Sequence, residues 1–214
     1  MNDGGIVYVV DDDPSVRDAL SSLIRSVGLG AVTFGTAQDF LRHPRGTEPA
    51  CVVLDVHLPD GSGLEVPGQL RSAGVAIPII FITGHGTIPM SVRAMKSGAM
   101  EFLTKPFTDE DLIGAIRVAL ERDRAAWSSR AELDALRTRM ERLTPRERDV
   151  LALMITGKLN KQIAGELGIA EQTIKQHRGR VMQKLEVESL AQLVRIMERA
   201  AGEPWAVTRP TKVP

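Results

Sequence analysis

Short runs of Val, Ile and Leu recur along the first half of the chain, and several of them end in a charged or hydroxyl-bearing residue. One run ends at Asp11 and Asp12, another at Asp55, another at Thr83 and another at Lys105. Runs of this length and composition are typical of strands buried on both faces, which indicates a parallel sheet. Parallel sheets carry reactive side chains at the carboxyl ends of their strands, so we expect these residues to converge.

The apolar runs alternate with amphipathic stretches of helical spacing. We expect strands at Ile6–Val10, Ala31–Phe34, Cys51–Leu54, Ile77–Ile82 and Glu101–Leu103. This alternation predicts an α/β fold with a doubly wound, five-stranded parallel sheet. Thr108 and Asp111 form a capping box for the last helix of the series. Pro67 and Gly68 interrupt the third helix, which should start late or kink there.

The charge of the expected cluster restricts its chemistry. The carboxylates of Asp11, Asp12 and Asp55 repel one another unless a hard divalent cation lies between them, and Mg²⁺ or Mn²⁺ suits such oxygen ligands. The cation would neutralise a phosphoryl group that arrives at one carboxylate. Lys105 would pair with the phosphoryl oxygens, and the Thr83 hydroxyl would complete the coordination.

These residues resemble the receiver domain of bacterial two-component response regulators, over roughly the first 120 residues. The resemblance implies a CheY-like receiver with Asp55 as the phospho-acceptor, Thr83 and Lys105 as activation residues and Phe102 as the switch aromatic. It also implies that His85-Gly86 belongs to the loop that enters the fourth helix in FixJ-type receivers.

The resemblance assigns the metal ligands as well. Asp11 and Asp12 are the acidic metal pair, and the Asp55 carboxylate and the backbone carbonyl of His57 are further ligands. The Lys105-Pro106 peptide is expected to be cis, a state open mainly to bonds that precede proline.

Each part of this pattern has a simpler interpretation. Asp11, Asp12 and Asp13 before Pro14 fit a helix cap, and Asp13 is expected to serve as one. Thr83-Gly84 fits an ordinary loop, and Lys105-Pro106 fits a strand end with a turn. The joint spacing of these residues in one βα series favours the receiver.

Two other functional classes are weighed against it. Asp11 to Ser15 also fits the D-x-D-x-[ST] pattern of haloacid-dehalogenase-like phosphatases, in which Asp11 is the nucleophile and Asp13 the acid/base. That family gives no special role to Asp55. A flavodoxin-like flavin carrier is less favoured, because the first βα turn lacks a Gly- or Ser/Thr-rich loop to bind a phosphate.

The net charge of zero conceals an acidic front and a basic rear. Residues 1–120 hold 9 Lys/Arg and 14 Asp/Glu, residues 121–142 hold 6 and 5, and residues 143–214 hold 12 and 8. This asymmetry indicates contact with nucleic acid by the rear domain.

Residues 123–142 are predicted to be a helical linker. Leu133, Leu136, Met140 and Leu143 form a short apolar stripe, and Trp127 is a candidate anchor. The stripe is shorter than the three to four heptads of a confident coiled coil, so packing against the chain's own domains is at least as favoured as dimerisation. A solvated helix is the third possibility.

A second domain is expected at residues 143–206, before a disordered tail at residues 207–214. Thr144, Pro145 and Glu147 form a capping box at its start. A helix from Asn160 to Leu167, a turn at Gly168 and a helix from about Glu171 to Leu185 have helix-turn-helix spacing. The motifs of residues 143–200 resemble the LuxR/NarL/FixJ DNA-binding domain, a small all-α fold.

The outward face of the Glu171–Leu185 helix is basic and fits the DNA major groove. By resemblance, Lys175 and Gln176 contact base edges. Contacts to phosphates are expected from Lys161, Thr173, Arg178, Arg180 and Lys184. His177 is favoured as a partly buried structural residue. Gly179 replaces a side chain that some relatives use in the groove, and Ala170 replaces a common capping Ser. The alternative is a protein-binding three-helix bundle.

The prediction is a transcriptional regulator of the FixJ/NarL type, with a receiver at residues 1–122, and not an enzyme. The expected partners are a sensor histidine kinase, double-stranded promoter DNA, RNA polymerase and a second copy of the chain when phosphorylated. A phosphorylation-controlled protein adaptor is the competing class. The sequence contains neither a signal peptide nor an apolar span, so a cytoplasmic location without membrane contact is expected.

Overall fold

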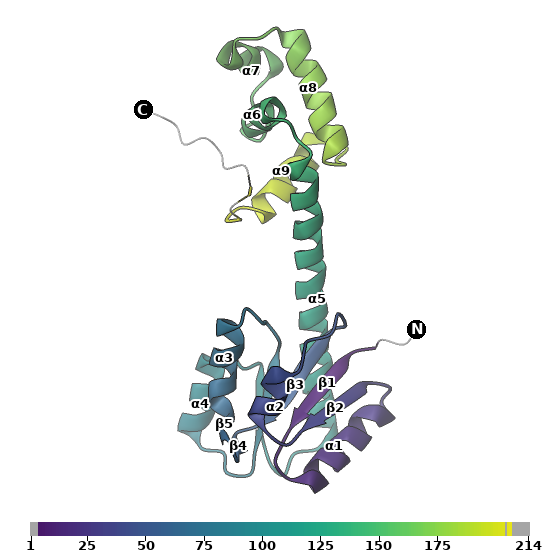
Figure 1. The fold of residues 1–214 in the computed structure, drawn as a ribbon, viewed down its shortest axis with the longest axis vertical. Helices are drawn as coiled ribbons and strands as arrows, with labels where there is room; N and C mark the ends of the chain where they lie inside the picture. The colour runs from purple at the N-terminus through teal and green to yellow at the C-terminus, as the bar shows by residue number, and fades with distance from the viewer. Residues whose placement is uncertain (1–3, 204, 207–214) are drawn as a thin grey trace. The chain divides into compact units, whose positions relative to one another are not determined.

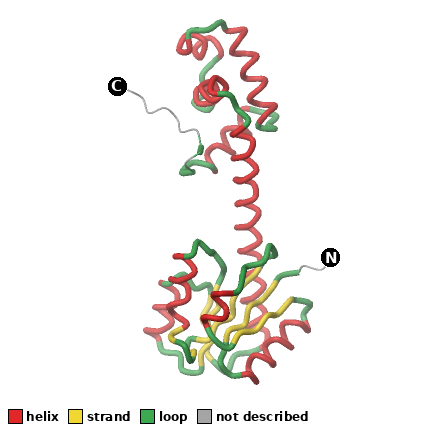
Figure 2. The backbone as a smooth tube through the Cα atoms, viewed as in Figure 1, coloured by secondary structure: helices red, strands yellow, loops and turns green. Residues whose placement is uncertain are grey.

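The computed structural model describes residues 4–203, 205 and 206, and these residues form two compact units that divide between residues 128 and 129 (Figures 1 and 2). The first unit contains strands and helices, and the second contains helices. The tail predicted at residues 207–214 lies outside the described residues. Within the described part of the chain, no helix is long and apolar enough to cross a membrane.

The first unit is built on a five-stranded parallel sheet with the strand order β2-β1-β3-β6-β7. The strands span Ile6–Val10 (β1), Gly30–Phe34 (β2), Ala50–Asp55 (β3), Ile79–Thr83 (β6) and Glu101–Thr104 (β7). All five expected strands are present, and each differs from the prediction by at most two residues at either end. The order reverses beside β1, which is the topological switch point where α/β sheets place their sites.

Helices cover both faces of the sheet. They span Pro14–Ser26 (α1), Ala37–Arg42 (α2), Val66–Ser72 (α3), Ile88–Lys96 (α4) and Asp109–Glu141 (α5). Alternate residues of each strand point to opposite faces, so the unit has two apolar cores. Val9 and Ile80 pack with residues of α1 and α5, such as Ile24 and Ile116, and the other core contains Leu54, Phe81 and residues of α2, α3 and α4. The doubly wound fold is therefore confirmed.

The segment after β3 contains structure that the sequence did not predict. Residues His57–Leu58 (β4) and Gly61–Ser62 (β5) form a two-stranded hairpin, and a 3-10 helix at Gly63–Glu65 follows. Helix α3 then starts at Val66 with Pro67 in its first turn, where the missing N–H of proline is tolerated. The late start predicted from Pro67-Gly68 is confirmed.

Helix α5 is continuous from Asp109 to Glu141 and belongs to both units. It begins at the predicted capping box, since Thr108 Oγ1 accepts from the backbone N–H of Asp111 and the Asp111 carboxylate accepts from Thr108. The division between the units, at residues 128 and 129, falls inside the segment expected as a linker. Trp127 is partly buried, with the Arg45 guanidinium 5.4 Å from its ring centroid.

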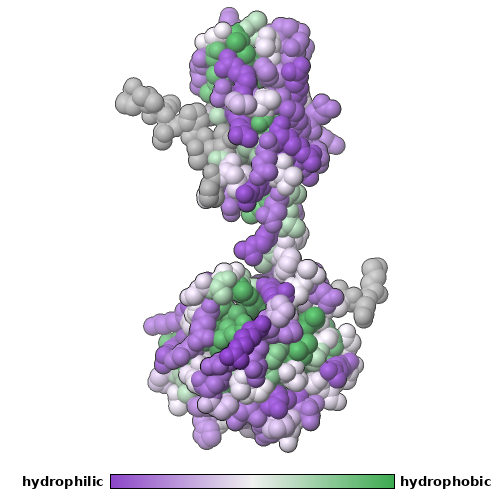
Figure 3. All heavy atoms as spheres, viewed as in Figure 1, coloured by the Kyte–Doolittle hydropathy of each residue, from purple (hydrophilic) through white to green (hydrophobic). Residues whose placement is uncertain are grey.

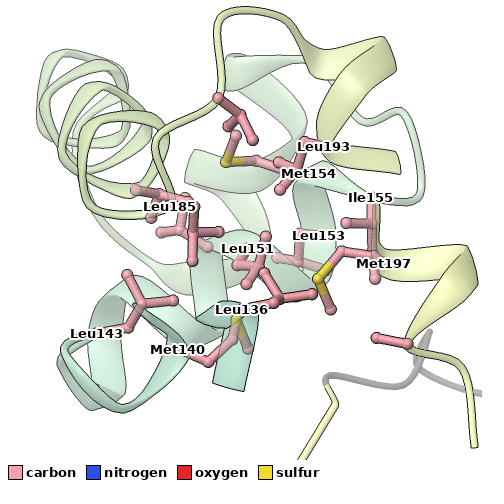
Figure 4. Packing of buried hydrophobic residues seen from close by; sticks show 14 of the residues in the cluster. Leu136, Met140, Leu143, Leu151, Leu153, Met154, Ile155, Leu185, Leu193 and Met197 are labelled. Atoms are coloured by element: carbon pink, nitrogen blue, oxygen red, sulfur yellow. The ribbon is translucent and has the colours of Figure 1, made fainter. Parts of the chain in front are cut away.

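The second unit consists of the end of α5 and further helices at Pro145–Met154 (α6), Asn160–Leu167 (α7), Glu171–Lys184 (α8) and Leu190–Arg199 (α9). The predicted apolar stripe of the linker packs here: Leu136, Met140 and Leu143 are buried in the core of this unit (Figure 4). Helix α9 was not predicted. Its signal is Ser189, whose side chain accepts from the N–H of Gln192 as an N-cap.

Candidate functional site

The carboxyl ends of β1, β3 and β7 bring Asp11, Asp55 and Lys105 together. The Lys105 ammonium donates to Asp11 Oδ2 and to Asp55 Oδ2, and each distance is 2.7 Å. Both carboxylates are buried, whereas Lys105 is partly exposed. The structure therefore brings these three residues into direct contact, and the Lys105-Pro106 peptide that follows is cis as predicted.

Backbone amides hold the second oxygen of each carboxylate. Asp11 Oδ1 accepts from the N–H of Asp13 at 2.9 Å, and Asp55 Oδ1 accepts from the N–H of His57 at 2.8 Å. Asp13 caps α1 as expected by accepting from the N–H of Ser15. The Arg17 guanidinium donates to the carbonyl oxygens of Asp11 and Asp12 and so fixes the loop after β1. No sequence pattern predicted this role of Arg17.

The electrostatics of the cluster follow from burial and pairing. Burial raises the pKa of Asp11, and the hydrogen bonds from Lys105 and from the Asp13 backbone oppose this only in part. Burial also lowers the pKa of Lys105, but its hydrogen bonds to Asp11 and Asp55 outweigh that effect and leave the pKa raised. Lys105 is therefore a permanent positive charge beside Asp55 at neutral pH.

Thr83 ends β6 at the same edge of the sheet, and its side chain is fully buried. Its hydroxyl lies 3.4 Å from His57 Nδ1 and accepts from the backbone N–H of His85 at 3.2 Å. The two histidine rings, both exposed, stand edge to face with their centroids 6.4 Å apart. From the sequence, only the backbone carbonyl of His57 was assigned a role. The contacts of its side chain were not predicted, because no local pattern shows that the loops after β3 and β6 meet.

Phe102, the predicted switch residue, is partly buried against the core on the α2–α4 side of the sheet. The loop after Thr83 approaches it closely. A Cβ atom at Gly86 would lie 2.4 Å from Thr104 Cγ2 and 3.4 Å from the Phe102 ring. Gly63 is more restricted, since a Cβ there would lie 2.2 Å from the backbone oxygen of Asp55. Both glycines are needed for close packing around the site.

The predicted metal ligands fit a hard cation by their chemistry. Asp11 and Asp55 present adjacent carboxylates, and the burial that raises the pKa of Asp11 is a cost that a nearby cation would reduce. Asp12, the third carboxylate, is exposed. Among the described residues, no three His, Cys, Asp or Glu side chains are already placed to hold a metal ion. The Lys105 ammonium contacts both buried carboxylates.

The second unit contains the predicted helix-turn-helix. Helix α7 ends at Gly168, which has the left-handed φ of 64°, and α8 starts after Ala170, which provides no side-chain cap. Ile174 and Val181 of α8 are buried, while Lys175, Gln176 and Arg180 are exposed. Hydrophilic atoms cover α8 on the face shown in Figure 3. The exposed side chains of α8 are thus available to a ligand.

The remaining residues predicted to contact DNA differ in exposure and in their partners inside the protein. Lys161 is exposed, and Thr173 is partly buried. Arg178 donates to the carbonyl oxygen of Lys158 at 3.4 Å. His177 is partly buried, as favoured from the sequence, and its Nδ1 is buried without a partner among the described residues.

Lys184 has a strong partner inside the unit. Its ammonium donates to the buried Glu147 carboxylate at 2.7 Å and to the carbonyl oxygen of Arg142 at 3.1 Å. Glu147 also closes the predicted capping box with Thr144. Burial raises the pKa of Glu147, but the hydrogen bonds from Lys184 and Thr144 outweigh it and hold the pKa below its usual range. The capping box was predicted, whereas the link to α8 was not.

Comparison with known proteins places both units. Residues 7–117 match the response regulator receiver domain, and residues 141–197 match the luxR family of bacterial regulatory proteins. The chain is 50% identical to nodulation protein W of Bradyrhizobium diazoefficiens, over 90% of this chain and 85% of that protein. It is 47% identical to the response regulator protein TodT of Pseudomonas putida, over 91% of this chain and 86% of TodT.

Solved structures agree with these matches. The response regulator StyR superposes with a TM-score of 0.81 at 50% identity, over 91% of this chain and 98% of StyR. Full-length FixJ from B. japonicum gives a TM-score of 0.55 at 40% identity, over 92% of this chain and 97% of FixJ. The chain therefore belongs to the FixJ/NarL family of two-component response regulators, in which a receiver domain is joined to a luxR-type helix-turn-helix domain.

Proposed function

We propose that this transcriptional regulator accepts a phosphoryl group on Asp55 from the histidine of a sensor kinase, then dimerises and binds promoter DNA. The observation that carries the proposal is the Lys105 ammonium, which contacts the carboxylates of Asp11 and Asp55 at the carboxyl edge of the sheet. The buried hydroxyl of Thr83 ends the neighbouring strand.

In this proposal the Asp55 carboxylate attacks the phosphorus of phosphohistidine. A new O–P bond forms as the N–P bond breaks, and the kinase imidazole leaves with the electron pair. Lys105 pairs with the phosphoryl oxygens as a fixed point charge. Mg²⁺ or Mn²⁺, when bound by Asp11, Asp12, Asp55 and the His57 carbonyl, supplies neutralisation of the phosphoryl charge. The backbone N–H of His57 orients the attacking carboxylate.

The switch in this proposal is Thr83, which turns toward the phosphoryl oxygens while Phe102 rotates inward. These movements alter the face formed by α4, β7 and α5, as a shift between two populations. Helix α4 carries an exposed apolar stripe, with Ile88 82%, Val92 46% and Met95 50% exposed. Apolar side chains at this spacing on one helix face suit a homodimer contact.

Dimerisation would place two α8 helices on paired half-sites of the promoter and raise affinity through effective concentration. Lys175 and Gln176 are proposed to contact bases, with Lys161, Thr173, Arg178, Arg180 and Lys184 at phosphates. Lys184 must first exchange its Glu147 partner, so the exposed Lys161 and Arg180 are the readier phosphate contacts. The bound dimer is proposed to act on RNA polymerase.

Phosphorylation of Asp55 tests the first step. With a divalent cation and a small phosphodonor, the wild-type chain should gain one phosphoryl group, and Asp55→Asn should gain none. Mass spectrometry locates the modified residue. Undiminished labelling of Asp55→Asn at Asp11, with turnover of many phosphomonoesters per chain, would instead indicate a phosphatase of the haloacid-dehalogenase type.

Sedimentation tests the dimer. A fragment of residues 1–128 is preferable to one that ends at residue 122, because it retains Asp123 and Trp127 in contact with Arg45. Beryllofluoride, which mimics the phosphoryl group, should convert this fragment to a dimer, and Val92→Glu on the exposed α4 stripe should prevent it. A fragment that stays monomeric in both states would move the dimer contact to the second unit.

A further inference from the structure

The Thr83 hydroxyl already has two partners inside the protein. It lies 3.4 Å from His57 Nδ1 and accepts a hydrogen bond from the backbone N–H of His85 at 3.2 Å. Because the Thr83 side chain is fully buried, water does not provide an easy alternative. The internal partners therefore determine where this hydroxyl points in the absence of a phosphoryl group.

A hydroxyl group has a single proton and so donates only one hydrogen bond at a time. The His85 backbone is a donor and leaves that proton free. The imidazole of His57 accepts this proton at Nδ1 in the tautomer whose own proton is on Nε2. A phosphoryl oxygen at Asp55 needs the same proton from Thr83 in the switch proposed above.

We propose that His57 is a positioning residue which competes with the phosphoryl group for the only proton of the Thr83 hydroxyl. In the resting state the bond from Thr83 to His57 Nδ1 holds the hydroxyl away from Asp55. Activation requires that this bond break, so the side chain of His57 sets part of the equilibrium between the two states. The inference rests on the proposed role of Asp55 as phospho-acceptor.

The structure provides a closely matched control. His57 and His85 are both exposed histidines in neighbouring loops, with rings that contact each other. Only the ring of His57 reaches the Thr83 hydroxyl, whereas His85 contributes its backbone N–H. Replacement of either ring by Leu keeps both backbone groups, including the His57 N–H that bonds Asp55.

The experiment uses the full chain with Mg²⁺ and beryllofluoride, and ¹⁹F NMR measures the apparent affinity for the bound fluoride. His57→Leu should bind beryllofluoride roughly two to ten times more tightly than wild type, as loss of one competing neutral hydrogen bond requires. His85→Leu should stay within about twofold of wild type. An affinity of His57→Leu equal to or weaker than that of wild type would overturn the proposal.

Thr83→Val separates competition for the proton from a steric effect. In the Thr83→Val background His57→Leu should have no effect on the affinity, because the shared hydroxyl is gone. The same gain in both backgrounds would show that His57 acts by bulk alone. In wild type, ¹⁵N NMR of the imidazole should show Nδ1 without a proton in the resting state, and a protonated Nδ1 would contradict the mechanism.

These outcomes are distinct from failure of the proposed function. A wild-type chain that binds no beryllofluoride and gains no phosphoryl group at Asp55 would refute the receiver chemistry itself. A wild-type chain that does both, with a silent His57→Leu, would refute only the role of His57.

Discussion

Replacement of Arg45 by Met should destabilise the first unit, because it removes one of the two partners of a buried carboxylate. Asp123 is 3% exposed, and its Oδ2 accepts from the Arg45 guanidinium and, at 2.8 Å, from the backbone N–H of Ala50. Arg45 also donates to the carbonyl oxygen of Ala76 and lies over the Trp127 ring. The Arg45 side chain thus links its own loop and the loop of Ala76 to α5, and Asp123 links α5 to β3.

The size of the effect follows from burial. Loss of one partner of a buried ion pair costs about 3–5 kcal/mol, because the other charge is left without compensation. The Arg45 side chain is 17% exposed, so water can partly replace it, and we reduce the expected cost to about 2–3 kcal/mol. That loss should increase the opening equilibrium of the unit roughly 30-fold to 140-fold.

Cys51 is a specific probe of this opening. It is the only cysteine of the chain and has no exposed surface in β3, next to Ala50. Burial, together with the nearby Asp123, raises the pKa of its thiol to about 12, so the folded state holds almost no reactive thiolate. Under native conditions the rate of labelling by a thiol reagent therefore reports opening of the first unit alone.

Arg42→Met is the matched control. Arg42 pairs with Asp39 at 3.9 Å, but the two side chains are 75% and 60% exposed. Such surface pairs contribute little, so the labelling rate should stay within about twofold of wild type. If Arg45→Met is labelled at the rate of Arg42→Met, the buried pair does not stabilise the unit and the argument from burial is refuted.

Three further predictions concern other parts of the chain. The depressed pKa of Glu147 contributes stability that is present above about pH 4.5 and is lost as the pH falls through the folded pKa. Glu147→Gln should therefore make the unfolding free energy of the second unit depend less on pH in the acid range. An unchanged pH dependence would argue against the pairing with Lys184. Gly63→Ala should reduce phosphorylation of Asp55 and speed thiol labelling, since its Cβ would lie 2.2 Å from a backbone oxygen; a wild-type phosphorylation rate would show that the loop adapts freely. In DNA-binding isotherms at several salt concentrations, Arg180→Ala should weaken binding to specific and random duplexes alike and reduce the slope of log affinity against log salt by about one. Lys175→Ala should instead cost roughly 1–3 kcal/mol of binding free energy, mainly on the specific site. Equal losses for Lys175→Ala on both duplexes would make Lys175 a phosphate contact.

The sequence by itself determined most elements of this protein, the β4–β5 hairpin and α9 excepted, and the group of charges at the sheet edge. Apolar residues recur with periods of 2 in strands and 3.6 in helices, so both can be predicted from the sequence. Helix caps such as Thr144 with Glu147 join residues only three positions apart. Gly168 marks a helix end because its backbone adopts a left-handed conformation. The proximity of Asp11, Asp55 and Lys105 could be predicted, since the carboxyl ends of parallel strands lie at one edge of the sheet.

Only the tertiary structure decided which side chains meet from elements distant in the chain. Arg45 and Asp123 are 78 positions apart, and their contact depends on the path of two loops and the length of α5. The bond between Lys184 and Glu147 likewise depends on how α8 packs against α6. The contact between His57 and Thr83 depends on an unpredicted hairpin after β3. Local periodicity carries no information on such pairs, because they form only when separate elements pack and remove their polar groups from water.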